Sequence, residues 1–227
     1  MLELVGNAEI VLLGTTATLA VGHTLLGIDH SLPFIVLGRS RSWTLRHTVA
    51  ITALCGVGHV ASSVVIGLVG VAVGLTLDSL VWFESIRGEL AAVLLIGFGL
   101  IYTAWAGWQR LRNRAHSHSQ TLADGTVHSH GAGPGLTTLT LFIIFVLGPC
   151  ESLIPLMVVP AMTRSWTLLA AVVTIFGILT ISTMVGAVIV GYRGLGLVTI
   201  RRLECHADVL AGLVIAASGA AVLVLGV

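Results

Sequence analysis

The sequence predicts an all-α integral membrane protein with six transmembrane helices. The chain has 227 residues, of which 56% are hydrophobic and 9% are charged, and its mean hydropathy is +1.04. A soluble domain carries about 25% charged residues, so this composition belongs to the membrane class. Apolar runs long enough to cross about 30 Å of hydrocarbon occur at roughly 14–38, 46–70, 88–110, 136–160, 165–191 and 206–227.

The arginines predict the orientation in the plasma (inner) membrane. With the N-terminus outside, the cytoplasmic side holds Arg39, Arg41, Arg46, Arg110, Arg112, Arg114, Arg193, Arg201 and Arg202. Only Arg87 and Arg164 then remain outside, and the charge pattern places Glu84 beside Arg87 in an outer loop. The positive-inside rule therefore predicts both termini outside. With a net charge of +1 and no basic block, nucleic acid is not expected as a partner.

Two parts of the chain repeat each other. Arg41-Ser42-Trp43-Thr44-Leu45 recurs as Arg164-Ser165-Trp166-Thr167-Leu168, and Ser31-Leu32 recurs as Ser152-Leu153 at nearly the same offset. Two copies of a three-helix unit cross the bilayer in opposite directions, which places a site near the midplane where the copies meet. We therefore expect inverted three-helix repeats at 1–111 and 136–227, joined by a cytoplasmic linker at 112–135.

The first predicted span contains two histidines and an aspartate. His23, Asp29 and His30 lie in a long apolar run, where an ionisable group is costly and is by default a functional-site hypothesis. On a regular helix the two histidines lie about 10.5 Å apart along the axis, too far for one ion to touch both. Gly27 and Pro33 favour a break in this helix. A broken membrane helix is tolerated where it lines a cavity or a site.

The fourth predicted span carries a second polar point. A glycine and two prolines bracket Cys150 and Glu151, again the pattern of a broken helix. In the repeat these two residues correspond to Asp29 and His30. The polar points of the two copies are therefore expected to face each other near the middle of the membrane.

The second predicted span adds Cys55 and His59, which lie four residues apart on one helical face. His59 lies near mid-span and is expected to reach the site. A lone buried cysteine such as Cys55 often behaves as a small apolar residue. The linker carries two His-x-His pairs, which suit accessory metal capture as well as a disordered tract: His116, His118, His128 and His130.

These motifs resemble those of known metal permeases. His23-Thr-Leu-Leu-Gly-Ile-Asp29-His30 resembles the His-Pro-x-x-Gly-x-Asp-His signature of the HupE/UreJ hydrogenase and urease accessory permeases. With one residue more before the aspartate, it is also similar to the His-x-x-x-x-Asp-His signature of nickel/cobalt transporters. Gly148-Pro-Cys-Glu-Ser-Leu-Ile-Pro155 is similar to Gly-Pro-Cys-Glu-Pro-Leu-Ile-Pro of UreH-like urease accessory membrane proteins. These families share the six-helix inverted-repeat plan of the lysine-exporter superfamily.

The resemblance implies a transporter of a divalent transition metal, nickel or cobalt first, that works by alternating access. Imidazoles, carboxylates and one or two thiols suit these ions, whereas magnesium and calcium favour nearly all-oxygen sites. The expected ligands are His30, Asp29, His59 and Cys55 from the first repeat and Cys150 and Glu151 from the second, with His23 as a relay toward the outside. No enzymatic activity and no tightly bound cofactor are expected, because the metal is cargo.

Two other functions stay open. A thiol redox carrier like the CcdA cytochrome c biogenesis proteins shares the inverted repeat and has a Pro-Cys element in each half. Cys150 fits that pattern, but its repeat mate is Asp29, and Cys55 lies in a different span. A membrane scaffold could instead deliver metal to urease or hydrogenase maturation proteins without transporting it. A flux assay in liposomes separates a scaffold from a permease.

Overall fold

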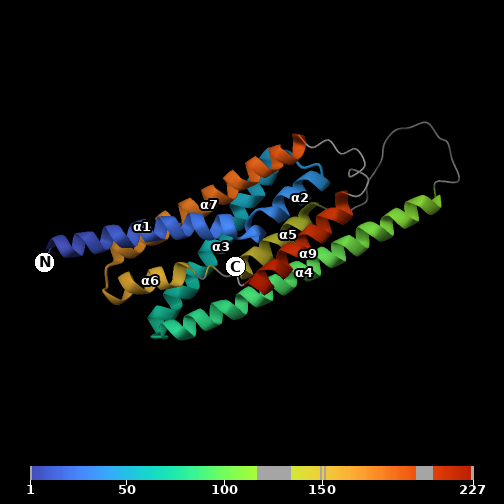
Figure 1. Cartoon of the computed structure of the whole chain (residues 1–227). Coiled ribbons are helices and arrows are strands. Elements are labelled where there is room, and N and C mark those ends of the chain that lie inside the picture. The colour runs from blue at the N-terminus through green and yellow to red at the C-terminus, as the bar shows by residue number, and fades with distance from the viewer. Residues whose placement is uncertain (1, 117–133, 149, 151, 198–206, 226–227) are drawn as a thin grey trace.

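The described part of the chain is helical throughout (Figure 1). A computed structural model of the protein describes residues 2–116, 134–148, 150, 152–197 and 207–225. The helices are α1 (Leu2–Leu26), the short 3-10 helix η1 (Ile28–His30), α2 (Leu32–Ser40), α3 (Leu45–Val73), α4 (Leu77–His116), α5 (Pro134–Leu147), α6 (Leu153–Met162), α7 (Trp166–Leu197) and α9 (Ala207–Leu225). No strand occurs within these ranges.

Five stretches of the described helices are long and apolar enough to cross a membrane: Gly6–Leu26, Leu45–Val73, Leu77–Gln109, Trp166–Gly194 and Ala207–Val224. Large apolar side chains point outward from them, for example Ile101 at 72% exposure and Val190 at 73%. Water disfavours such a surface, and the hydrocarbon of a bilayer accepts it. The chain is therefore a multi-pass membrane protein.

The helices are interrupted in the first and fourth predicted spans. α1 ends at Leu26 and α2 begins at Leu32, with Pro33 in its first turn, where a missing N–H breaks no helical hydrogen bond. α5 ends at Leu147 and α6 begins at Leu153. The stretch predicted as a span at 136–160 is thus two short apolar helices. The described chain does not contain six continuous spans.

The third predicted span begins earlier than the sequence indicates. The apolar stretch of α4 covers Leu77–Gln109, whereas the prediction is 88–110. Glu84 and Arg87, predicted in an outer loop, are buried within this helix. The prediction is wrong because the two side chains are one turn apart and form an ion pair. As an ion pair, the two side chains can be buried in apolar surroundings in which either charge alone would be far more costly.

Two helix pairs are joined by shorter elements. α4 and α9 lie side by side, and so do α1 and α7 (Figure 1). A Cβ on Gly99 of α4 would lie 2.5 Å from the backbone nitrogen of Ala216 on α9, so glycine allows this close approach. α2 contacts both α7 and α9, while α5 contacts α3 and α4. α2, which follows the first interruption, therefore contacts one helix of each pair, and α5, which precedes the second, contacts α4 of the first pair.

The same backbone turn follows each short helix. Ser42 follows α2 and Arg164 follows α6, and both residues have a φ of 53°. In each turn the N–H of the next residue donates to the carbonyl five residues earlier, at 2.8 Å in the first turn and 2.9 Å in the second. A long helix, α3 or α7, then begins. Interruption, short helix, turn and long helix therefore occur in the same order twice.

Candidate metal centre

The interruption after α1 brings His23 and His30 together. The Gly27 N–H donates to the His23 carbonyl at 2.8 Å, and the His30 N–H donates to the Gly27 carbonyl at 3.1 Å. The two ring centroids are 5.3 Å apart, closer than the about 10.5 Å axial separation on a regular helix. A Cβ on Gly27 would lie 2.3 Å from His30 Nδ1, so only glycine leaves room for this ring. His23, predicted as a relay, thus lies beside His30.

A third histidine comes from α3. The ring centroid of His59 lies 5.2 Å from that of His30, with the ring planes at 89°. One ligand atom from each of His23, His30 and His59 lies within 4.8 Å of the other two. Ligand atoms around one tetrahedral ion lie about 3.4 Å apart, given metal–nitrogen bonds of about 2.0–2.1 Å. To hold one tetrahedral ion, the three ligand groups would therefore have to move closer together.

Each of the three imidazoles is oriented through its Nδ1. The partner is an oxygen in every case: the Leu19 carbonyl at 3.0 Å for His23, the Asp29 carboxylate at 3.1 Å for His30, and the Phe145 carbonyl at 3.3 Å for His59. Because these carbonyl and carboxylate oxygens accept hydrogen bonds, they favour the tautomer with hydrogen on Nδ1. Every Nε2 then keeps a lone pair. Outer partners of this kind orient metal-ligating histidines and raise their basicity.

Two of these lone pairs have no partner in the described structure. The Nε2 atoms of His30 and His59 are buried and receive no hydrogen bond from any described residue. The exposed fractions of the two residues are 7% and 2%. A buried polar atom left unsatisfied costs about 1–3 kcal/mol, which a purely structural core would avoid. A metal ion bound by these nitrogens would remove that cost.

A small cavity adjoins the histidines. It measures about 30 Å³ and is lined by Asp29, His30, His59 and Gly148, together with apolar residues of α4, α5 and α9. This space holds about one water molecule, so it fits an ion that has shed its hydration shell. A larger groove of about 690 Å³ between α3 and α4 is lined mostly by apolar side chains and shares no residue with the cavity. The candidate metal ligands His30 and His59 therefore line the smaller cavity and not the larger groove.

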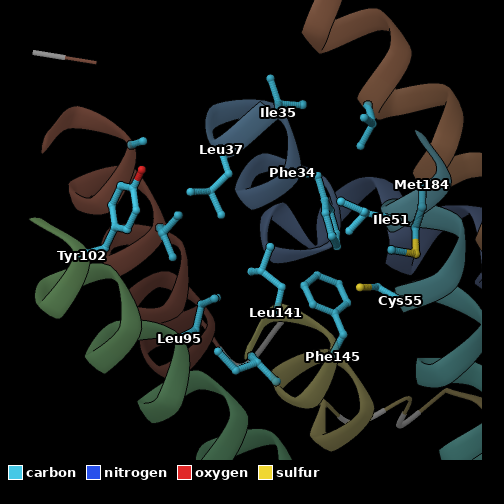
Figure 2. Packing of buried hydrophobic residues seen from close by; sticks show 14 residues of the cluster. Phe34, Ile35, Leu37, Ile51, Cys55, Leu95, Tyr102, Leu141, Phe145 and Met184 are labelled. Carbon is cyan, nitrogen blue, oxygen red and sulfur yellow. The ribbon is translucent and has the colours of Figure 1, made fainter. Parts of the chain in front are cut away.

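The two predicted thiol ligands lie in different surroundings. Cys150 follows α5, and its Sγ is 4.0 Å from His23 Nε2. Cys55 instead packs against Phe34 and Phe145 in an apolar cluster formed by several helices (Figure 2). Cys150 belongs to a separate apolar cluster. Of the two sulfurs, that of Cys150 lies beside His23, although it is not one of the three converging ligand groups.

The remaining predicted ligands divide into two sets. Asp29 contacts the imidazole of His30 and is not one of the converging ligand groups, so here it acts on a histidine. The others lie outside what the structure describes, including the side chain of His116 at the end of α4: Glu151, His116, His118, His128 and His130.

Two charged residues beside the site are missed by the sequence analysis. Arg87 donates hydrogen bonds to the carbonyls of Val146 and Gly148 at 2.9 and 3.3 Å. Glu84 accepts a hydrogen bond from the backbone N–H of Cys150 at 3.2 Å. The available signal is a pair of opposite charges three residues apart next to a long apolar run. Such a pair usually indicates an exposed helix face, so the sequence alone does not point to the site.

Comparisons with known proteins add no further support for a particular family. The resemblance to metal permeases rests on the motifs around Asp29 and Cys150, and it stays a prediction. We therefore infer metal binding from those motifs together with the geometry of the three imidazoles and the thiol. No family model, curated protein or solved structure matches this chain.

Proposed function

We propose that this protein is a membrane transporter for a divalent transition-metal ion, with nickel or cobalt as its cargo. One observation carries the proposal: three imidazoles converge from α1, η1 and α3, with one ring nitrogen of each within 4.8 Å of the others and with each Nδ1 within hydrogen-bonding distance of an oxygen. This is the arrangement that metal-ligating histidines adopt in proteins. It lies in a chain of apolar helices, where polar groups mark pathways for ions and substrates.

The donor atoms support this choice of cargo. Imidazole nitrogen suits nickel, cobalt, copper and zinc, and a neighbouring thiol strengthens that preference. Magnesium dehydrates reluctantly and usually keeps several waters, which a cavity of about 30 Å³ does not admit. Calcium takes six to eight oxygen ligands, and this site offers few. The choice of nickel or cobalt within the transition metals follows the motif resemblance.

The proposed mechanism is alternating access between two three-helix units, 1–111 and 136–227, that run in opposite directions with both termini outside. It is supported by the order of interruption, short helix, turn and long helix, which occurs once in each half. The histidines come from the first half and Cys150 from the second. An ion at the site would therefore touch both units, and their relative movement would open it to one side of the membrane at a time.

The test is a titration of nickel and cobalt into purified wild type, His30→Gln and His47→Gln. Loss of a residue that hydrogen-bonds a metal ligand commonly costs 10- to 100-fold in affinity, and loss of the His30 imidazole should cost at least that much. His47 is the matched control, because it is exposed on the same helix as His59 and packs against Trp43. Its variant should bind like wild type.

The same titration at a second pH sharpens the result. A ligating imidazole must be neutral, so protons compete with the ion. Binding should weaken as the pH falls through about 6.5, the value of an unperturbed histidine. Equal affinities in all three proteins, or binding that ignores pH, would contradict the metal site. Metal uptake by proteoliposomes then tests transport, and binding without flux would identify a scaffold instead.

A further inference from the structure

Glu84 and Arg87 form a buried ion pair to which the group of three histidines assigns no role. Both residues lie within the apolar stretch Leu77–Gln109, and their exposed fractions are 0% and 8%. Arg87 Nη1 donates to Glu84 Oε1. Charged residues at such positions are costly and by default functional. Replacing a buried ion pair with apolar residues is often neutral or stabilising, so stability alone does not account for this one.

Arg87 holds the end of α5. Its Nη2 lies 2.9 Å from the Val146 carbonyl oxygen and 3.3 Å from the Gly148 carbonyl oxygen. The last carbonyls of a helix have no intrahelical partner, and here a guanidinium supplies one. Nη2 also donates to the Ser62 hydroxyl at 3.0 Å, which in turn donates to the His59 carbonyl at 2.8 Å. One side chain therefore ties the end of α5 to the helix that carries His59.

Glu84 holds the chain just beyond that end. Its Oε2 accepts a hydrogen bond from the backbone N–H of Cys150 at 3.2 Å, while its Oε1 accepts from Arg87. The thiol of Cys150 lies 4.0 Å from His23 Nε2. The carboxylate thus fixes the backbone from which this sulfur reaches the histidines. The two charged residues act on consecutive parts of the same interruption.

We infer that Glu84 and Arg87 are positioning residues that hold the Cys150 thiol as the fourth ligand of the metal site. The inference rests on the proposed function. Three imidazole nitrogens and one sulfur make a four-coordinate set for a borderline metal ion. On binding, the thiol proton leaves to water and the thiolate becomes the ligand. Without the pair, the backbone around Cys150 loses its supports, and the sulfur turns away while the imidazoles stay.

Cobalt(II) provides the readout, because a thiolate ligand adds a sulfur-to-cobalt charge-transfer band in the near ultraviolet that imidazole ligands do not produce. The test variant is Glu84→Leu combined with Arg87→Met, which removes both charges together and leaves none unpaired. Cys150→Ser is the positive control for loss of the band. Glu89→Leu is the matched control, because Glu89 is an exposed carboxylate on the same helix.

We expect the charge-transfer band in wild type and Glu89→Leu, and its loss in Cys150→Ser and the double variant. The double variant should still give the visible bands of cobalt bound by imidazoles, with affinity reduced about 10-fold or more, as for lost outer-shell partners. A wild-type band in the double variant would overturn the positioning role. Cobalt binding by wild type without this band would remove Cys150 from the ligands and leave the proposed function intact. If wild type did not bind cobalt at all, both the role of Cys150 as a ligand and the proposed function would be contradicted.

A second variant covers the case in which the double variant does not fold. Arg87→Lys keeps the charge of the pair, but an ammonium lacks the planar fork that reaches a carboxylate and two carbonyls together. The measurement is the rate of maleimide labelling of Cys150 in metal-free protein. The other two cysteines of the chain, Cys55 and Cys205, are replaced by alanine for this purpose. We expect faster labelling in Arg87→Lys than in the same protein with Arg87 intact. Equal rates would overturn the inference.

Discussion

The two interruptions in the helices differ in what holds them. The first, between α1 and α2, is held by its own residues, because Gly27 is hydrogen-bonded through its backbone to both His23 and His30. The second, between α5 and α6, is held from α4 by Glu84 and Arg87. The site therefore has two sides. The self-contained side, around Gly27, carries the imidazoles of His23 and His30, and the braced side, held by Glu84 and Arg87, carries the thiol of Cys150. Substitutions on the two sides should therefore differ in how far they lower metal affinity and in which ligand they disturb.

Among single substitutions that leave every ligand in place, the largest effect should come from Gly27→Ala, which disturbs the self-contained side. The new Cβ would lie 2.3 Å from Nδ1 and 2.8 Å from Cε1 of His30, so the ring must leave its position and its contact with Asp29. We expect metal affinity to fall by about 10- to 100-fold, as for lost outer-shell support. Titration calorimetry with nickel measures this.

Gly22→Ala is the control for that variant. Gly22 lies on the same helix, and a Cβ there would have no heavy atom within 4 Å. It should bind like wild type, because alanine adds no clash and favours the helix. If Gly27→Ala also bound like wild type, His30 would not need its present position, and the first interruption would not organise the site.

A smaller effect is expected from Gly148→Ala on the braced side. The added Cβ would lie 3.2 Å from the Phe145 carbonyl oxygen and 3.5 Å from His59 Nδ1, close to the contact that orients His59. These atoms need to yield by only a few tenths of an ångström. We expect a loss of affinity below the roughly 10-fold that accompanies a deleted outer-shell partner. A loss as large as that of Gly27→Ala would remove the distinction between the two sides.

The same distinction explains how much of the site the sequence predicts. Gly27 and Pro33 are local signals, and the predicted interruption near them is confirmed. The place of His23 is not predicted, because helix geometry separates it from His30 until the shape of the turn is known. His59 is predicted from its position near mid-span, and it does lie beside His30.

The braced side is harder to predict because its contacts join distant parts of the chain. Glu84 and Arg87 are visible as opposite charges one turn apart, but their burial depends on how α4 packs against α3 and α5. Their partners include Val146, Gly148 and Cys150, which follow them only after a long stretch of other sequence. Periodicity and motif spacing describe single helices, so they carry no information about such contacts. The all-helical membrane fold, in contrast, follows from the apolar composition and from the length of the apolar runs.

The smallest effect on metal binding should come from Cys55→Ala, which tests whether the thiol ligand belongs only to the braced side. Cys55 is fully buried between Phe34 and Phe145 (Figure 2), so losing its sulfur should cost about 1 kcal/mol of stability, as for one buried methylene. Nickel affinity should stay unchanged, because Cys55 packs in the apolar cluster, whereas the sulfur that lies 4.0 Å from His23 Nε2 is that of Cys150. If Cys55 were instead a metal ligand, its loss should lower nickel affinity by at least about 10-fold. Such a loss, or a disulfide between Cys55 and Cys150 trapped after mild oxidation, would instead favour a metal site with two thiols or a redox carrier.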